Sequence, residues 1–177
     1  MRNSMRRMSV VTVGLCLVVQ PVSAQIEKGD RSLGLQGLFT TKTGGDSSQT
    51  LGMVLASLNF FQTRNFAWRV SVIEMAGSSG EDTSSGTLLG GGFEWNFNEQ
   101  GSTKIPFVAV DGAYFLFPDF NALMVSPSAG ARFFLNRKTS FDVAASYNTF
   151  LSGEASGGGL VLVRLGFSYY FGKDTRK

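Results

Sequence analysis

The chain has 177 residues, no histidine and one cysteine, Cys16. Without histidine, Ser-His-Asp and Cys-His catalytic arrangements are excluded, and so are most zinc sites. The 16 Lys and Arg residues outnumber the 13 Asp and Glu residues, and the excess equals Arg2, Arg6 and Arg7 at the N-terminus. The rest of the chain is therefore balanced in charge, and no basic patch predicts a nucleic-acid partner.

The first 24 residues predict a secretory signal peptide. Its features are a positive start, a short apolar core and a cleavage site of small residues, formed by Arg2, Arg6 and Arg7, by Val10–Val19, and by Val22, Ser23 and Ala24. An uncleaved anchor helix is the alternative, but the apolar core is much shorter than the about 20 residues that span a bilayer. We therefore expect a signal peptide, residues 1–24, and one mature domain, residues 25–177, without cysteine and without disulfides.

Eight segments with alternating side-chain chemistry follow. Apolar and polar residues alternate over about ten residues, which is the length of a strand that crosses a membrane. The segments are Ser32–Thr41, Leu51–Phe61, Phe66–Ala76, Thr87–Phe97, Lys104–Phe117, Ala122–Leu135, Phe141–Leu151 and Gly159–Phe171. They predict an all-β fold, an eight-stranded antiparallel up-and-down transmembrane β-barrel.

The last segment shows the pattern most clearly. Successive side chains point to opposite sides of a strand. One side of this segment is wholly apolar, and it consists of Val161, Val163, Leu165, Phe167, Tyr169 and Phe171. The other side is mixed and includes Arg164 and Ser168. Such a strand suits a barrel wall with lipid outside and a polar lumen inside.

The breaks between the segments predict the two ends of the barrel. Compact breaks with turn-forming or charged residues are Gln62–Asn65, Asn98–Thr103 and Asn136–Lys138. Breaks that are generally longer and rich in Gly, Ser and acid are Thr41–Gln49, Gly77–Gly86, Pro118–Asn121 and Ser152–Gly158. Aromatic residues gather beside the compact breaks, which predicts a girdle at one membrane interface. A soluble sandwich with aromatic core layers is the alternative, and it leaves this clustering unexplained.

Charged residues recur on the inner side of the third to eighth segments. They are Arg69, Glu94, Asp111, Arg132, Asp142 and Arg164. Isolated charges there would carry a large desolvation cost, and a barrel of eight strands is just wide enough for side chains to fill it. We therefore predict an internal network of arginine–carboxylate pairs. A proton or ligand site is a functional alternative, but the equal numbers of both signs favour a structural core.

Other polar features predict no catalytic, cofactor or metal site. Glu81 and Asp82 lie in a predicted loop and are more typical of solvated charge than of a divalent-cation site. Gly90–Gly92 and Gly157–Gly159 are not phosphate loops, because no helix follows them and no G-K-[ST] is present. Acidic residues in the predicted loops indicate an acidic outer rim. That rim would either meet divalent cations that bridge lipopolysaccharide or simply promote solubility.

Four stretches of the chain resemble the small outer-membrane β-barrel family, the OmpA-like and opacity-type eight-stranded barrels of Gram-negative bacteria. They are Leu58–Arg69, Ile105–Tyr114, Gly130–Tyr147 and the ending Leu165–Lys173. The resemblance covers nearly all of the mature chain and implies residence in the outer membrane. It also implies that the barrel-assembly machinery recognises an aromatic residue at the end of the last strand, here Phe171, although Gly172–Lys177 follow it.

We therefore predict a monomeric outer-membrane β-barrel protein with no cofactor and no enzymatic activity, in contact with outer-membrane lipid and lipopolysaccharide. Its role would be structural, in surface interaction or in minor permeability, with a polar lumen filled by side chains. The alternative is a soluble periplasmic β-barrel that binds a small apolar ligand and places its apolar side inward. A membrane enzyme without histidine ranks third. The sequence identifies no ligand or surface partner.

Overall fold

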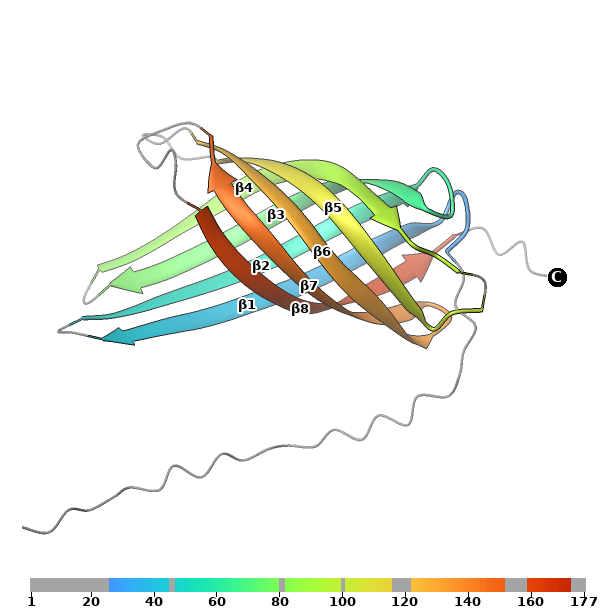
Figure 1. Cartoon of the computed structure of the whole chain (residues 1–177). Coiled ribbons are helices and arrows are strands. Elements are labelled where there is room, and N and C mark those ends of the chain that lie inside the picture. The colour runs from blue at the N-terminus through green and yellow to red at the C-terminus, as the bar shows by residue number, and fades with distance from the viewer. Residues whose placement is uncertain are drawn as a thin grey trace, which may run out of the picture.

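The chain folds as a closed β-barrel of eight antiparallel strands (Figure 1). The computed structural model describes residues 26–44, 47–79, 82–99, 101–115, 122–151 and 159–172. The strands are β1 (Arg31–Gly44), β2 (Ser47–Phe61), β3 (Phe66–Ser79), β4 (Asp82–Asn96), β5 (Lys104–Phe115), β6 (Leu123–Asn136), β7 (Thr139–Phe150) and β8 (Gly159–Phe171). The predicted fold class is confirmed, and the predicted signal peptide, residues 1–24, lies outside the described residues. The described part of the chain contains no helix that could cross a bilayer.

Each strand pairs with its neighbours in sequence, and β1 closes the barrel by pairing with β8. β1 begins and β8 ends at the same end of the barrel as the short turns (Figure 1). Register partners followed around the wall from Leu33 lead to Gly159 on β8, whereas Leu33 itself pairs with Tyr169. This offset is the stagger that tilts the strands of a barrel. The tilt brings side chains from strands that are distant in sequence to the same depth in the lumen.

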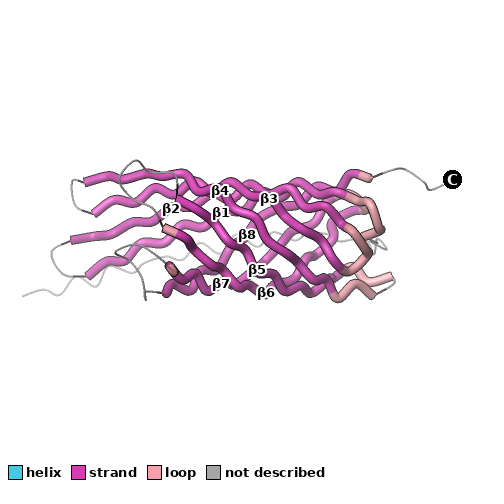
Figure 2. Tube along the Cα trace, turned by 90° about the horizontal axis from the view of Figure 1, so that it is seen from above, coloured by secondary structure: helices cyan, strands magenta, loops and turns pink. Residues whose placement is uncertain are grey.

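The short turns are confirmed, but two predicted long loops are wrong. β1 extends to Gly44 and β2 begins at Ser47. In the same way, β3 extends to Ser79 and β4 begins at Asp82. Most of Thr41–Gln49 and Gly77–Gly86 is therefore strand, and the β1–β4 sheet projects at the loop end (Figure 2). The polarity of these Thr- and Ser-rich segments misled the sequence prediction, although Thr is itself favoured in strands. Pro118–Asn121 and Ser152–Gly158 lie outside the described residues.

The predicted assignment of the two faces is also confirmed. Val110 and Val163 are 52% and 54% exposed, whereas their neighbours Asp111 and Arg164 are 7% and 4% exposed. Large apolar side chains are exposed on all eight strands, for example Leu33, Val54, Val70, Phe93, Val108, Phe133, Tyr147 and Phe167. An apolar belt around a whole barrel is unfavourable in water but suits hydrocarbon. The fold is therefore that of a barrel whose outer wall faces lipid.

We predict that Val110→Arg blocks assembly far more than Gln62→Arg. Val110 points outward in the middle of β5, where a buried guanidinium costs about 2–4 kcal/mol at the bilayer centre. Gln62 lies in the exposed β2–β3 turn, where the same charge remains in water. The fraction of each purified variant that folds into lipid vesicles is measured from the gel mobility of unboiled samples. Equal folded fractions would mean that Val110 does not face lipid.

Candidate functional site in the barrel interior

The centre of the lumen is built around one buried carboxylate, that of Glu94 on β4. Arg132 of β6 holds it with two hydrogen bonds, from Nη1 to Oε1 and from Nη2 to Oε2, both 2.6 Å long. Arg69 of β3 forms an ion pair with the same carboxylate through Nη2. Glu94 and Arg132 are each only 1% exposed. Paired and multiply hydrogen-bonded charges of this kind can remain ionised inside a protein.

Two further carboxylates extend this arrangement across the lumen. Arg69 Nη1 lies 3.1 Å from Asp111 Oδ2, and Arg132 Nε lies 3.4 Å from Asp142 Oδ2. We call Arg69, Glu94, Asp111, Arg132 and Asp142 the lumen ion cluster. Its members come from strands β3 to β7. The cluster therefore ties five of the eight strands together from the inside.

Neutral side chains satisfy the remaining hydrogen-bonding capacity of the cluster. The hydroxyls of Ser140 and Ser168 donate to Asp142 over 2.6 Å and 2.7 Å. Asn96 donates to Glu94 and accepts from Arg132, and Asn59 accepts from Arg69 Nε over 2.8 Å. Sequence reasoning did not single out Ser140 or Asn96. Each lies two residues from a charged member on the same face of its strand, and that spacing was the available signal.

Arg164 is placed differently from the other two lumen arginines. It lies on the inner face of β8 and is 4% exposed. Among the residues that the structure describes it takes part in no ion pair, and its Nε has no hydrogen-bond partner. It neighbours Leu162, which belongs to an apolar part of the lumen. The structure thus brings five of the six predicted charges into one cluster and leaves Arg164 apart from it.

Two apolar clusters fill the lumen on either side of the ion cluster. The turn-end cluster consists of Ile26, Phe61, Ala67, Ile105, Phe134 and Tyr170. The loop-end cluster consists of Met53, Leu55, Ile73, Leu88, Ala113, Ala122, Met124 and Leu162. The charged part of the predicted polar inner face therefore lies between two apolar clusters, while neutral polar side chains such as Ser146 and Asn98 are buried beside those clusters. A lumen this narrow packs as a protein core, and apolar layers at its ends shield the ion pairs from water.

The turn-end cluster includes a residue that precedes the first strand. Ile26 is 2% exposed and packs in the mouth of the barrel. Its carbonyl oxygen accepts a hydrogen bond of 3.1 Å from Asn98 Nδ2, which fixes the entering chain across the end of the barrel. Sequence reasoning missed Ile26, because a single apolar residue outside an alternating segment carries no periodic signal.

A glycine on β4 makes room for the ion cluster. Gly92 pairs with Asp111 across the β4–β5 ladder. A Cβ atom at Gly92 would overlap the carbonyl oxygen of Val110 and lie 2.5 Å from Asp111 Oδ1. Only a residue without a side chain leaves Asp111 its present position beside Arg69.

The remaining predicted sites are Phe171 and the acidic pair Glu81 and Asp82. Phe171 ends β8, pairs with Arg31 of β1 and is partly exposed on the outer face. Its role in assembly stays a prediction. Glu81 and the side chain of Asp82 lie outside the described part of the structure. Among the described residues, no group of three or more His, Cys, Asp and Glu side chains is positioned to hold a metal ion.

Comparison with known proteins supports the fold. No protein-family model and no curated protein matches the chain. Among solved structures, the N-terminal β-barrel domain of Pseudomonas aeruginosa OprF matches with a TM-score of 0.57 and 16% sequence identity, over 81% of this chain and 98% of that one. A de novo designed transmembrane β-barrel matches with a TM-score of 0.46 and 14% identity, over 83% of this chain and 99% of that one. The likeness to OprF shows that this chain has the fold of an eight-stranded membrane β-barrel.

We predict that Arg132→Met destabilises the folded barrel by about 3–5 kcal/mol, because the buried carboxylate of Glu94 loses its bidentate partner. Adding Glu94→Gln should recover part of the lost stability, since the unpaired buried charge is then removed. The measurement is urea unfolding of the barrel in lipid vesicles, followed by tryptophan fluorescence, for both single variants and the double variant. A double variant whose loss equals the sum of the single losses would mean that the two side chains are not coupled.

We also predict that Gly92→Ala destabilises the barrel by about 1–3 kcal/mol through overpacking against β5. Gly112→Ala is the matched control, because the nearest atoms to a Cβ at Gly112 are 3.9 Å away. Both variants are compared by the same urea unfolding. Equal stability of the two would contradict the close approach of Asp111 to Gly92.

Proposed function

We propose that the chain is an outer-membrane protein, exported through a signal peptide that is cleaved after Ala24, whose sealed barrel has a structural and surface-presenting role. The observation that carries this proposal is the layered lumen. The ion cluster lies between two apolar clusters, and its central side chains, Glu94 and Arg132, are each 1% exposed. A lumen filled in this way favours a structural membrane protein over an open pore.

Permeability is minor in this proposal, because a solute has to break two kinds of contact. It must displace the apolar side chains at either end, and it must part ion pairs that lose their partners when separated. Removing one partner of a buried pair costs several kcal/mol. Both costs oppose a stable open path through the wild-type barrel.

Surface interaction is a second candidate role, and the projecting sheet favours it. β1 pairs with β8 only from Arg31↔Phe171 to Gly37↔Leu165, although β8 begins at Gly159. From residue 38 to residue 44, β1 pairs with no described strand on that side. Free strand edges accept further strands by backbone hydrogen bonding. The proposed surface role is therefore the presentation of this edge outside the membrane.

The partners in this proposal follow from location. The exposed apolar belt contacts membrane lipid, the loop end contacts lipopolysaccharide, and the assembly machinery recognises the end of β8 at Phe171. The barrel acts as a monomer, without cofactor and without enzymatic activity. The match of the two faces to lipid outside and ions inside supports these partners.

The alternative, a soluble barrel with an apolar ligand inside, is not favoured. It requires charges outside and an apolar cavity inside, and the described side chains show the opposite distribution. Cell fractionation separates the two functions. We expect the protein in the outer-membrane fraction, with unboiled and boiled samples that migrate differently on a detergent gel. Recovery in the periplasmic fraction without detergent would defeat the proposal.

We predict that the purified barrel forms no stable large conductance in planar bilayers. The layered lumen leaves no continuous water path, so only rare, brief events are expected. A porin recorded under the same conditions is the positive control for insertion. Stable, long-lived open channels from the wild-type protein would show that the lumen is not sealed, even if the protein resides in the membrane.

A further inference from the structure

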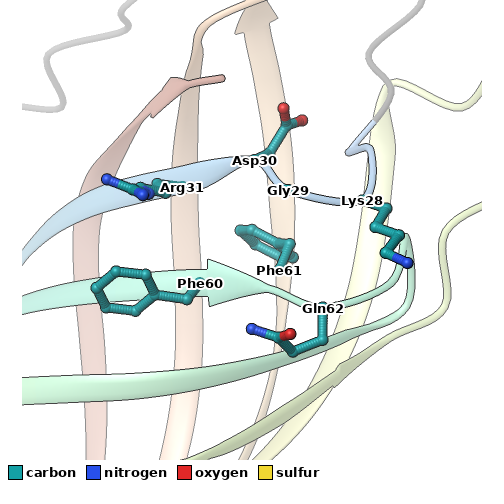
Figure 3. A pocket seen from close by; sticks show the side chains of 7 residues that line it. All are labelled: Lys28, Gly29, Asp30, Arg31, Phe60, Phe61 and Gln62. Carbon is teal, nitrogen blue, oxygen red and sulfur yellow. The ribbon is translucent and has the colours of Figure 1, made fainter. Parts of the chain in front are cut away.

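A hollow of about 180 Å³ opens at the turn end of the barrel, where the chain enters β1 beside the end of β2. Its lining residues are Lys28, Gly29, Asp30, Arg31, Phe60, Phe61 and Gln62 (Figure 3). Backbone hydrogen bonds hold its two walls together, from Gly29 N–H to the Phe61 carbonyl at 2.8 Å and from Phe61 N–H to the Asp30 carbonyl at 2.9 Å. The hollow is therefore a fixed feature of the fold.

The hollow has an excess of positive charge. Lys28 and Arg31 are exposed, and among the described residues neither forms an ion pair. The one acid in the lining, Asp30, points away from Lys28 and Gln62 (Figure 3). Its carboxylate accepts a 2.9 Å hydrogen bond from the backbone N–H of Glu27. Figure 3 shows the two cations on opposite sides of the hollow, Arg31 beside Phe60 and Lys28 beside the entering chain. Because neither forms an ion pair with a described residue, an anion is the ligand that they would attract.

The hollow lies next to the aromatic edge of the lipid-facing wall. Arg31 lies over the ring of Phe60 at 5.7 Å, and Phe60 stacks on Trp68 with ring centroids 4.2 Å apart. Trp and Tyr rings favour the headgroup level of a membrane. Leu33 and Leu35 are exposed on the same face of β1 as Arg31, deeper in the wall. An acyl chain can therefore run along β1 while its headgroup stays in the hollow.

We propose that this hollow binds the phosphate of an anionic phospholipid in the leaflet at the turn end. Arg31 contacts the phosphate oxygens from the side of the lipid-facing wall, and Lys28 adds positive charge from the opposite side of the hollow. The side-chain amide of Gln62 contributes a donor, and the acyl chains lie against β1. This inference rests on the membrane location proposed above. Free phosphate carries the same charge, but it gains nothing from the apolar wall below the hollow, so the lipid is the ligand.

The test measures which lipids stay bound to the folded full-length mature chain. The protein is refolded in detergent micelles and exposed to phosphatidylglycerol or phosphatidylethanolamine with identical acyl chains, and bound lipids are counted by native mass spectrometry. The variant is Lys28→Gln with Arg31→Gln. The matched control is Arg137→Gln with Lys138→Gln, which removes the same charge from the β6–β7 turn.

We expect the wild type and the control to retain phosphatidylglycerol over phosphatidylethanolamine, and the Lys28/Arg31 variant to lose about tenfold or more of that retention. The single variants Lys28→Gln and Arg31→Gln are measured as well, each with an intermediate loss, so the test does not depend on folding of the double variant. Gel mobility of unboiled samples reports whether each variant is folded.

Three results from the variants and from competition with phosphate would overturn the inference. They are equal retention by the Lys28/Arg31 variant, an equal loss in the control, and displacement of the lipid by millimolar inorganic phosphate. Equal retention by the variant would mean that lipid does not bind in this hollow. An equal loss in the control would mean that only the net charge of the protein matters. Displacement by phosphate would mean that the hollow binds free anions. A wild-type chain that folds into vesicles but shows no lipid preference rejects this inference alone. Failure to fold into any membrane rejects the proposed function instead.

Discussion

Hydrocarbon offers no hydrogen bonds to an unpaired backbone group, and that constraint sets where this barrel can meet lipid. On the β1–β8 seam, pairing ends at Gly37↔Leu165. Beyond that point β1 pairs with no described strand on this side, which favours a position in water or among headgroups for this part of β1. Glu74 on β3 sets a similar limit, because its exposed carboxylate, which accepts a hydrogen bond from the Thr87 hydroxyl, would be costly in hydrocarbon. The projecting β1–β4 sheet thus belongs outside the bilayer, and the aromatic end of the barrel lies at the opposite interface.

The same lack of water acts inside the barrel, with a different result. A lumen lined only by polar side chains would admit water. A lumen lined only by apolar side chains would contain few contacts that are specific to one arrangement of the strands. The ion cluster provides that specificity, because the two arginines that hold Glu94 come from β3 and β6, and their partners Asp111 and Asp142 come from β5 and β7. The apolar clusters lower the local dielectric and strengthen these pairs. The apolar packing of the lumen and the specificity of the ion pairs therefore depend on each other.

The sequence predicted which face of each strand points inward, but it did not predict that the lumen is divided into layers. Side-chain parity within a strand is local, so the inward position of Asp111 and the outward position of Val110 follow from alternation alone. Which inward residues meet depends on the stagger around the barrel, which no single segment contains. Met53 and Leu55 illustrate the limit. They alternate with the outward residues Val54 and Ala56, and an uninterrupted apolar run does not show that its inward members gather at one end of the lumen.

Arg164 is explained by the charge of the whole lumen rather than by a contact. The ion cluster holds two arginines and three carboxylates, which leaves it one negative charge in excess. Arg164, buried on β8 at 4% exposure, restores neutrality without joining the cluster. Charges attract over longer distances where water does not screen them, so an arginine outside hydrogen-bond reach still stabilises a net-negative group. Its placement next to Leu162 also puts this charge toward the loop-end cluster. Neutrality of the buried charges as a group, and not pairing of each residue, is the condition that this lumen meets.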